Sequence, residues 1–253
     1  MRLKTAPAKN LYKYIISYFV LWILLFEFIL PSNNILPKPS VVLLSFSALW
    51  HYYKLLFNFT VTISAVYLSI LLAYFLTSLL SGYIVRKNHF VSEFLLSLHW
   101  FSHFIPAIVF GLFLIYWLPG SAYIEYLFAF FIALFSLVIR VNEEAAKVKH
   151  EYISSAVSLG VGESVIAKKV IWKSIQPAII KYLIVLQFNI WSVLIAFEFI
   201  KGGYGLGRIY RLALDYNDLS VLFTISIIVG ITIYLGTQLI KYFKNKFYHW
   251  SLD

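Results

Sequence analysis

Long apolar runs, separated by short polar segments, limit what this sequence can fold into more than any other feature. The runs are near-continuous rather than alternating, whereas a membrane β-barrel requires apolar and polar residues to alternate along each strand. Each run is long enough to cross about 30 Å of hydrocarbon as a helix. The pattern therefore predicts an all-α integral membrane protein with six transmembrane helices, over residues 14–30, 55–85, 101–118, 123–139, 178–200 and 219–240.

Composition favours the same class. Hydrophobic residues make up 61% of the chain and charged residues 13%, whereas an ordinary soluble domain has roughly 25% charged residues. The chain has no cysteine, which excludes disulfides, thiolate metal sites and cysteine nucleophiles. We expect one six-helix domain over residues 14–240, between a tail of residues 1–13 and a tail of residues 241–253.

The net charge of +10 is best explained by membrane topology. A basic soluble protein would suggest a nucleic-acid partner, but in membrane proteins lysine and arginine gather in the cytoplasmic segments. With both termini in the cytoplasm, most of the 21 lysines and arginines fall in the predicted inner segments. No nucleic acid is therefore expected as a partner, the lipid bilayer is, and residues 141–178 are predicted to form a cytoplasmic loop.

This loop contains the longest polar interval of the chain. Ala145, Val148, Tyr152, Ala156 and Leu159 recur at steps of three and four, which predicts one face of an amphipathic helix. A glycine can then turn left-handed after the helix end, and a second amphipathic run follows until a proline closes it. The pattern predicts a helix, a corner and a second helix at the membrane surface, or simply a structured cytoplasmic loop. The corner and closing residues are Gly160, Gly162 and Pro177.

In register, this loop resembles the cytoplasmic loop of bacterial ABC-importer permeases. There, a Glu-Ala-Ala triplet, a glycine and an Ile-x-Leu-Pro sequence form the helix that docks into an ATPase. Counted from Gly160, the first triplet position is Ser154 and the second sequence begins at Val170, with Pro177 matching a further proline. The motif glutamate and first proline are replaced here. The resemblance implies ATPase-coupling residues Glu151, Tyr152, Ser154, Ser155, Ala156, Leu159, Gly160, Gly162 and Glu163.

A second resemblance to the same family lies at the outer end of the fifth predicted span. Glu198 is followed there by a glycine-rich turn that has no nucleotide-binding spacing and is similar to the outer loop of these permeases. Polar side chains inside a span usually face the bundle or a cavity. The candidate translocation-path or outer-gate residues are Gln187, Asn189, Glu198, Gly205 and Gly207. The prolines of residues 36–40 further resemble the nitrate, sulfonate and taurine type.

The resemblance implies the permease subunit of a bacterial ABC importer in the cytoplasmic (inner) membrane. Its expected partners are an ABC ATPase in two copies, a second permease copy or paralogue, and an extracytoplasmic solute-binding protein. The chain has no P-loop, so we expect no enzyme activity of its own. ATP and Mg would be bound by the partner ATPase, and no cofactor or metal is expected on this chain.

Two other functions remain open. His99 and His103 are four residues apart and would share a helix face. With a further histidine such as His89, they could serve a membrane-embedded metal or haem enzyme, although histidines at such positions also form hydrogen bonds between helices. An independent channel is the third hypothesis, which the amphipathic inner loop disfavours.

Overall fold

The computed structural model describes residues 11–29, 37–85, 90, 93–94, 96–97, 100, 104–121 and 123–248, and the regular structure within them is all helical. Residues 1–10 and 249–253 of the predicted tails lie outside this part of the chain. Among the described residues, four helices are long and apolar enough to cross a membrane: Leu55–Ile84, Ile124–Ala145, Glu163–Lys201 and Leu219–Phe247.

These four helices correspond to the second, fourth, fifth and sixth predicted spans. The first and third predicted spans contain shorter apolar helices, Ile16–Ile29 and Ala107–Trp117. The all-helical, multi-pass prediction is confirmed, while the number of six spans stays a prediction. The third helix begins directly after Pro106, which stands at its N-cap, because proline has no N–H to donate within a helix.

The chain divides into two compact units, residues 1–56 with 209–229 and residues 57–208 with 230–253. The first unit contains α1 (Leu11–Ile23), the π-helix η2 (Leu24–Ile29), α2 (Pro39–His51), most of α10 (Leu206–Asp215) and the start of α11 (Leu219–Phe247). The second unit contains nearly all of α3 (Leu55–Ile84), then α5 (Ala107–Trp117), α6 (Ile124–Ala145), α7 (His150–Ser158), α8 (Glu163–Val165), the π-helix η3 (Ile166–Ile171), α9 (Trp172–Lys201) and the rest of α11.

Polar contacts organise the first unit. Glu27 of η2 accepts hydrogen bonds from the backbone N–H and the hydroxyl of Ser40, at 3.3 and 2.9 Å, and so satisfies a free donor in the first turn of α2. The buried hydroxyls of Ser45 and Thr224 lie 2.5 Å apart and join α2 to the first part of α11. Such hydrogen bonds between helices compensate for the weak hydrophobic drive within lipid.

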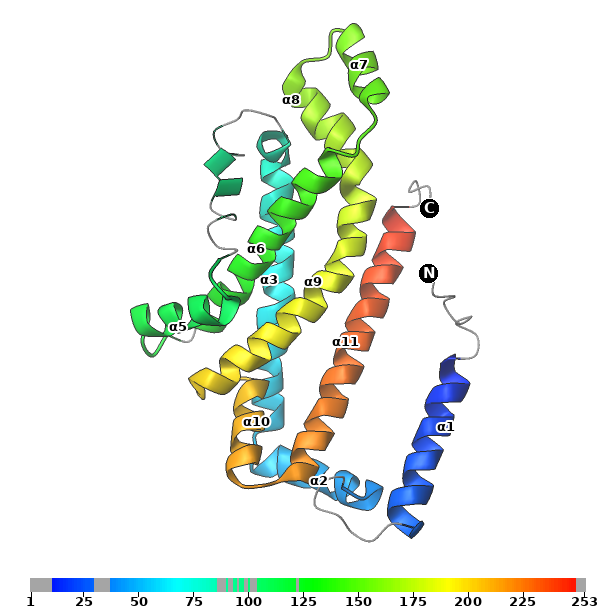
Figure 1. Ribbon diagram of the computed structural model, residues 1–253, viewed down its shortest axis with the longest axis vertical. Helices are drawn as coiled ribbons and strands as arrows, with labels where there is room; N and C mark the ends of the chain where they lie inside the picture. The colour runs from blue at the N-terminus through cyan, green and yellow to red at the C-terminus, as the bar shows by residue number, and fades with distance from the viewer. Residues whose placement is uncertain are drawn as a thin grey trace. The chain divides into compact units, whose positions relative to one another are not determined.

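The core of the second unit lies between α6 and α9, which pack along each other, with α5 against both (Figure 1). The rings of Phe128 and Phe197 stack with their centroids 4.3 Å apart. Gly111 of α5 permits this packing, because a Cβ there would lie 2.6 Å from the Phe197 ring. Small residues at such contacts allow helix backbones to approach closely.

Two predictions about the polar interval are wrong in detail. The stripe from Ala145 to Leu159 is not one helix, since α6 ends at Ala145 and α7 begins at His150. Nor does Pro177 close a helix: it is buried inside α9. A proline inside a helix costs about 3 kcal/mol, which burial of its neighbours Ile175 and Ile179, 3% and 0% exposed, offsets. Residues 163–201 are consequently one continuous helical rod.

Candidate functional site

The predicted loop contains a short helix held away from the bundle. Two tight turns follow α6. In one, the N–H of Lys147 donates to the Glu144 carbonyl at 3.1 Å, and in the other the N–H of Val148 donates to the Ala145 carbonyl at 3.2 Å. Lys149 then takes an extended conformation, with ψ of 131°, and α7 starts in a new direction (Figure 1). The conformation of the backbone at residues 147–149 thus separates α7 from α6.

Gly160 ends α7 in the left-handed conformation, with φ of +73°. Its N–H donates to the Val157 carbonyl at 2.9 Å, and the next N–H, of Val161, donates to the Ala156 carbonyl at 3.1 Å. This pattern is the glycine C-cap that satisfies the last carbonyls of a helix. The chain requires glycine here because of φ, and not because of space, since a Cβ at Gly160 would meet nothing within 4 Å.

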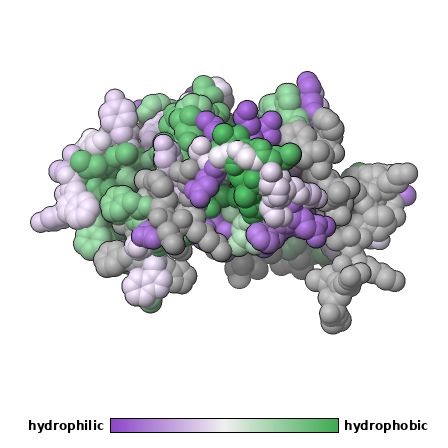
Figure 2. Space-filling view, turned by 90° about the horizontal axis from the view of Figure 1, so that it is seen from above, coloured by the Kyte–Doolittle hydropathy of each residue, from purple (hydrophilic) through white to green (hydrophobic). Residues whose placement is uncertain are grey.

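The predicted coupling residues lie on α7, in the turn that follows it and at the start of α8, and nearly all of them are exposed. Ala156 is the exception, 8% exposed, and α7 contacts η3. Apolar side chains remain uncovered, with Leu159 81% and Tyr152 56% exposed. Figure 2, which looks onto the α7 end, shows hydrophilic and hydrophobic residues side by side there. The exposed members are Glu151, Tyr152, Ser154, Ser155, Leu159, Gly160, Gly162 and Glu163.

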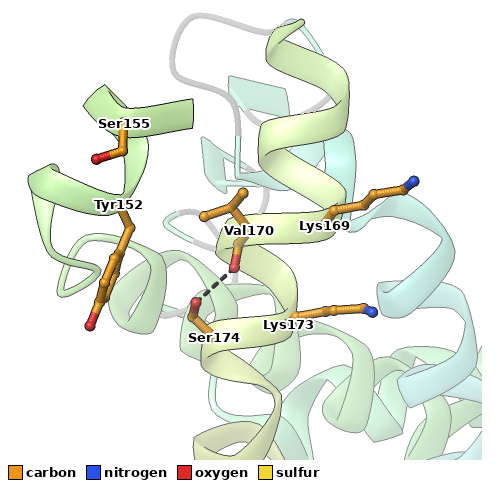
Figure 3. Close-up of a pocket in the computed structure, with 6 residues that line it drawn as sticks. All are labelled: Tyr152, Ser155, Lys169, Val170, Lys173 and Ser174. Atoms are coloured by element: carbon orange, nitrogen blue, oxygen red, sulfur yellow. Dashed lines mark hydrogen bonds between the residues drawn. The ribbon is translucent and has the colours of Figure 1, made fainter. Parts of the chain in front are cut away.

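A shallow cleft lies between α7 and the start of the long rod, with a cavity volume of about 600 Å³. Figure 3 shows Tyr152 and Ser155 on one side and Val170 and Ser174 on the other. The Ser174 hydroxyl donates to the Val170 carbonyl at 2.7 Å, so it is occupied locally. The remaining lining residues, Lys169 and Lys173, extend from the rod in the other direction (Figure 3).

Arg140 fixes the point at which α6 leaves the bundle. Its guanidinium lies 3.0 Å from Glu143 and 2.8 Å from Glu144, and 5.3 Å from the ring centroid of Tyr182 on α9. The ion pairs stay within α6, whereas the cation–π contact joins α6 to α9. The contact of Arg140 with Tyr182 thus holds the end of α6, where the loop begins, against α9.

The second candidate region is a buried turn around Glu198. Glu198 is 0% exposed and accepts a hydrogen bond from the Thr62 hydroxyl of α3, at 2.8 Å, and one from the N–H of Gly207, at 2.9 Å. The same hydroxyl accepts from the N–H of Leu206 at 2.8 Å, and Asn58 accepts from the N–H of Gly205 at 3.0 Å. The turn is thus tied to α3 and α9 by buried polar contacts.

Gly205 and Gly207 allow this approach. A Cβ at Gly205, where φ is +94°, would overlap the Glu198 carboxyl, and a Cβ at Gly207 would overlap the backbone of Ile195 and Phe199. Both glycines thus stand where the backbone of the turn approaches α9 and the Glu198 carboxyl closely.

An ion pair beside this turn was missed by sequence reasoning. Lys201 Nζ lies 2.7 Å from Glu125 Oε1, and their side chains are 11% and 1% exposed. The other oxygen, Oε2 of Glu125, has no hydrogen-bond partner among the described residues. The signal in the sequence was an acidic residue at the start of the fourth apolar run, since a carboxylate there must be paired.

The two polar candidates inside the fifth span lie in different surroundings. Gln187 is 0% exposed, and its Nε2 donates to Thr237 Oγ1 of α11 at 2.6 Å. The Tyr67 hydroxyl of α3 donates to its Oε1 at 3.3 Å, so Gln187 joins three helices. Asn189 is exposed on the opposite side of α9. The structure therefore brings Gln187 into the bundle and leaves Asn189 on its surface.

The histidines of the alternative hypothesis, His89, His99 and His103, lie outside the described residues. Within the part of the chain that the structure describes, no group of three or more possible metal ligands occurs. A haem or metal enzyme thus has no structural support here.

Comparison with known proteins adds one family. A search of curated proteins found no match. A family model described as the binding-protein-dependent transport system inner membrane component matches residues 70–247, which include α7, Gly160 and the Glu198 turn. Since the match covers most of the chain, the protein belongs to this family of inner membrane transport components and is the membrane permease subunit of an ABC importer.

Proposed function

We propose that this permease couples solute transport to a partner ATPase through α7 and the Gly160 turn. The observation that carries the proposal is the combination of a short helix held apart from the bundle and exposed apolar side chains on it, led by Leu159, 81% exposed. An exposed apolar helix rimmed by polar residues is typical of a protein contact. Ala156, buried at 8% exposure, would transmit movement of α7 to η3.

The wider assembly follows from the family and the charge pattern. Two ATPases, which hold ATP and Mg, would each receive one α7, and two permease chains, identical or paralogous, would enclose the path. Closure of the two ATPases would move the two permease bundles between inward and outward openings. The proposed topology has six spans in residues 14–240 with both tails, residues 1–13 and 241–253, in the cytoplasm.

The outer end would receive solute from an extracytoplasmic binding protein. The turn that contains Glu198, Gly205 and Gly207 is tightly packed. We expect it to move as one rigid part of an outer gate. Asn189, exposed on α9, would face the second permease copy or the path, and Gln187 would hold the wall of the path together. The prolines of residues 36–40 resemble those of the nitrate, sulfonate and taurine type of this family, and this subtype stays a prediction.

Two glycines offer a matched test of ATPase docking. A Cβ at Gly160, or at Gly82 in the last turn of α3, would meet nothing within 4 Å. The backbone φ is +73° at Gly160, whereas Gly82 is not among the glycines with positive φ. A β-branched residue at positive φ is strained. Gly160→Val should therefore abolish co-purification with the co-expressed ATPase and stop uptake, while Gly82→Val, outside the predicted coupling residues, should keep both.

Membrane insertion of both variants should be normal, as measured by their yield in washed membranes. If Gly160→Val inserts normally, binds the ATPase and supports uptake at the unaltered rate, the docking assignment is wrong.

A further inference from the structure

An apolar groove lies between the N-terminal half of α9 and the C-terminal half of α11, within the second unit. Ile180 and Leu183 of α9 and Ile240, Phe243 and Phe247 of α11 line it, together with Gln176 and Tyr248 at one end. Its cavity volume is about 570 Å³. The groove is separate from the cleft beside α7 and from the Glu198 turn, and neither proposed role uses it.

The groove ends at a hydrogen bond that bridges α9 and α11. Gln176, Ile180, Leu183 and Gln187 follow one another at steps of four, three and four along one face of α9. At Gln187 the hydrogen bond to Thr237, 2.6 Å long, bridges α9 to α11 and closes the space between them. From Gln176 to Gln187 the helix rises about 16 Å, roughly half of the 30 Å hydrocarbon core. The groove thus has the length of a single leaflet.

Each of the two helices carries a lysine within one turn of the residues at the open end of the groove. Lys173 precedes Gln176 by one helical turn, and Lys244 precedes Tyr248 by one turn. Lys244 is half-buried and Lys173 exposed, and Figure 3 shows Lys173 extending away from Tyr152 and Ser155. Within the described part of the chain, neither lysine forms an ion pair with a carboxylate. The charges therefore remain available to an anion.

We propose that the groove binds one anionic phospholipid. An acyl chain packs on the apolar lining, and the phosphate lies at Lys173 and Lys244. Basic pockets between transmembrane helices at the cytoplasmic side bind anionic headgroups in this way. A spanning helix of a second copy fits less well, because it would need a contact over about 30 Å, whereas the groove stops halfway. This proposal does not depend on ATPase docking.

The test uses the full permease in nanodiscs of phosphatidylcholine and phosphatidylglycerol, followed by native mass spectrometry of the lipid that stays bound after detergent extraction. The unaltered chain should retain phosphatidylglycerol in preference to phosphatidylcholine. Lys173→Gln with Lys244→Gln should lower that preference by about fivefold for each lysine, since one lysine near an anionic surface contributes about 1 kcal/mol. Ile240→Trp, which fills the groove and keeps the lysines, should release the lipid.

The matched control changes two other exposed lysines of the same helical segments, Lys168→Gln with Lys241→Gln, neither of which lies within one turn of Gln176 or Tyr248, and should retain the lipid as the unaltered chain does. Equal loss in both double variants would overturn the site, because it would reflect only net charge. A dimer that Ile240→Trp converts to monomer, with lipid retention unaltered, would assign the groove to a second copy instead. Because lipid retention is measured without the ATPase, this result does not depend on whether the ATPase docks on α7.

Discussion

The two candidate regions both depend on glycine, for opposite physical reasons. Gly160 has open space around it and a left-handed backbone, while Gly207 has no room for a Cβ. Around Gly160 the side chains are exposed, and around Gly207 the partner carboxylate of Glu198 is fully buried. The turn at Gly160 therefore has room for a side chain but requires one backbone shape, whereas the packed turn at Gly207 has almost no room for added volume.

This comparison predicts that changes near the buried turn lower the stability of the permease, while changes on α7 lower only its assembly. The predictions below are ordered by their expected effect on stability, measured by thermal unfolding in detergent.

The largest effect is expected from Lys201→Met. Removing the partner of a buried carboxylate leaves a charge uncompensated, which costs about 3 kcal/mol or more, and Glu125 is 1% exposed at its side chain. The control is Lys181→Met, an exposed lysine on the same helix, whose replacement should shift the unfolding midpoint little. Equal midpoints for the two variants would show that the ion pair contributes nothing.

Gly207→Ala comes next. The added methyl would overlap the backbone of Ile195 and Phe199, and overpacking costs about 1–3 kcal/mol. Gly230→Ala on α11, where a Cβ meets nothing within 4 Å, is the matched change and should be neutral or slightly stabilising, because alanine favours helix. The comparison fails if Gly207→Ala unfolds at the temperature of the unaltered protein.

The smallest effect on stability is expected from Leu159→Glu. Leu159 is 81% exposed, and exposed substitutions usually change stability by within about 0.5 kcal/mol. Retention of the ATPase, in contrast, should fall by about tenfold or more, since docking would bury a carboxylate that has no partner. A pull-down titration of the ATPase measures this. An unaltered titration would remove Leu159 from the interface.

Sequence patterns predicted the helical class and four of the spans, because any chain that crosses a lipid bilayer as helices needs long apolar runs. They also located Gly160, because a positive φ after a helix has a sequence signature. They missed the break between Ala145 and His150, where the apolar periodicity continues although the helix stops. They placed a helix end at Pro177, which packing overrides.

The partners of the Glu198 turn show a different limit. Thr62, which donates to Glu198, and Asn58, which accepts from Gly205, belong to α3, more than a hundred residues away in the chain. No periodicity within one segment reports such a contact. The sequence could identify Glu198 and its glycines as unusual. It could not say that they form a closed, satisfied cluster, because that depends on tertiary packing.

The absence of cysteine from the chain permits a direct test of the central claim, that α7 is the cytoplasmic docking element. Single cysteines at Leu159→Cys and Tyr204→Cys, both exposed positions, are labelled with a membrane-impermeant maleimide in vesicles of either orientation, with and without the ATPase. We expect labelling of position 159 from the cytoplasmic side alone, with protection by the ATPase, and labelling of position 204 from the outer side. Labelling of position 159 from outside, or without protection, would contradict the claim.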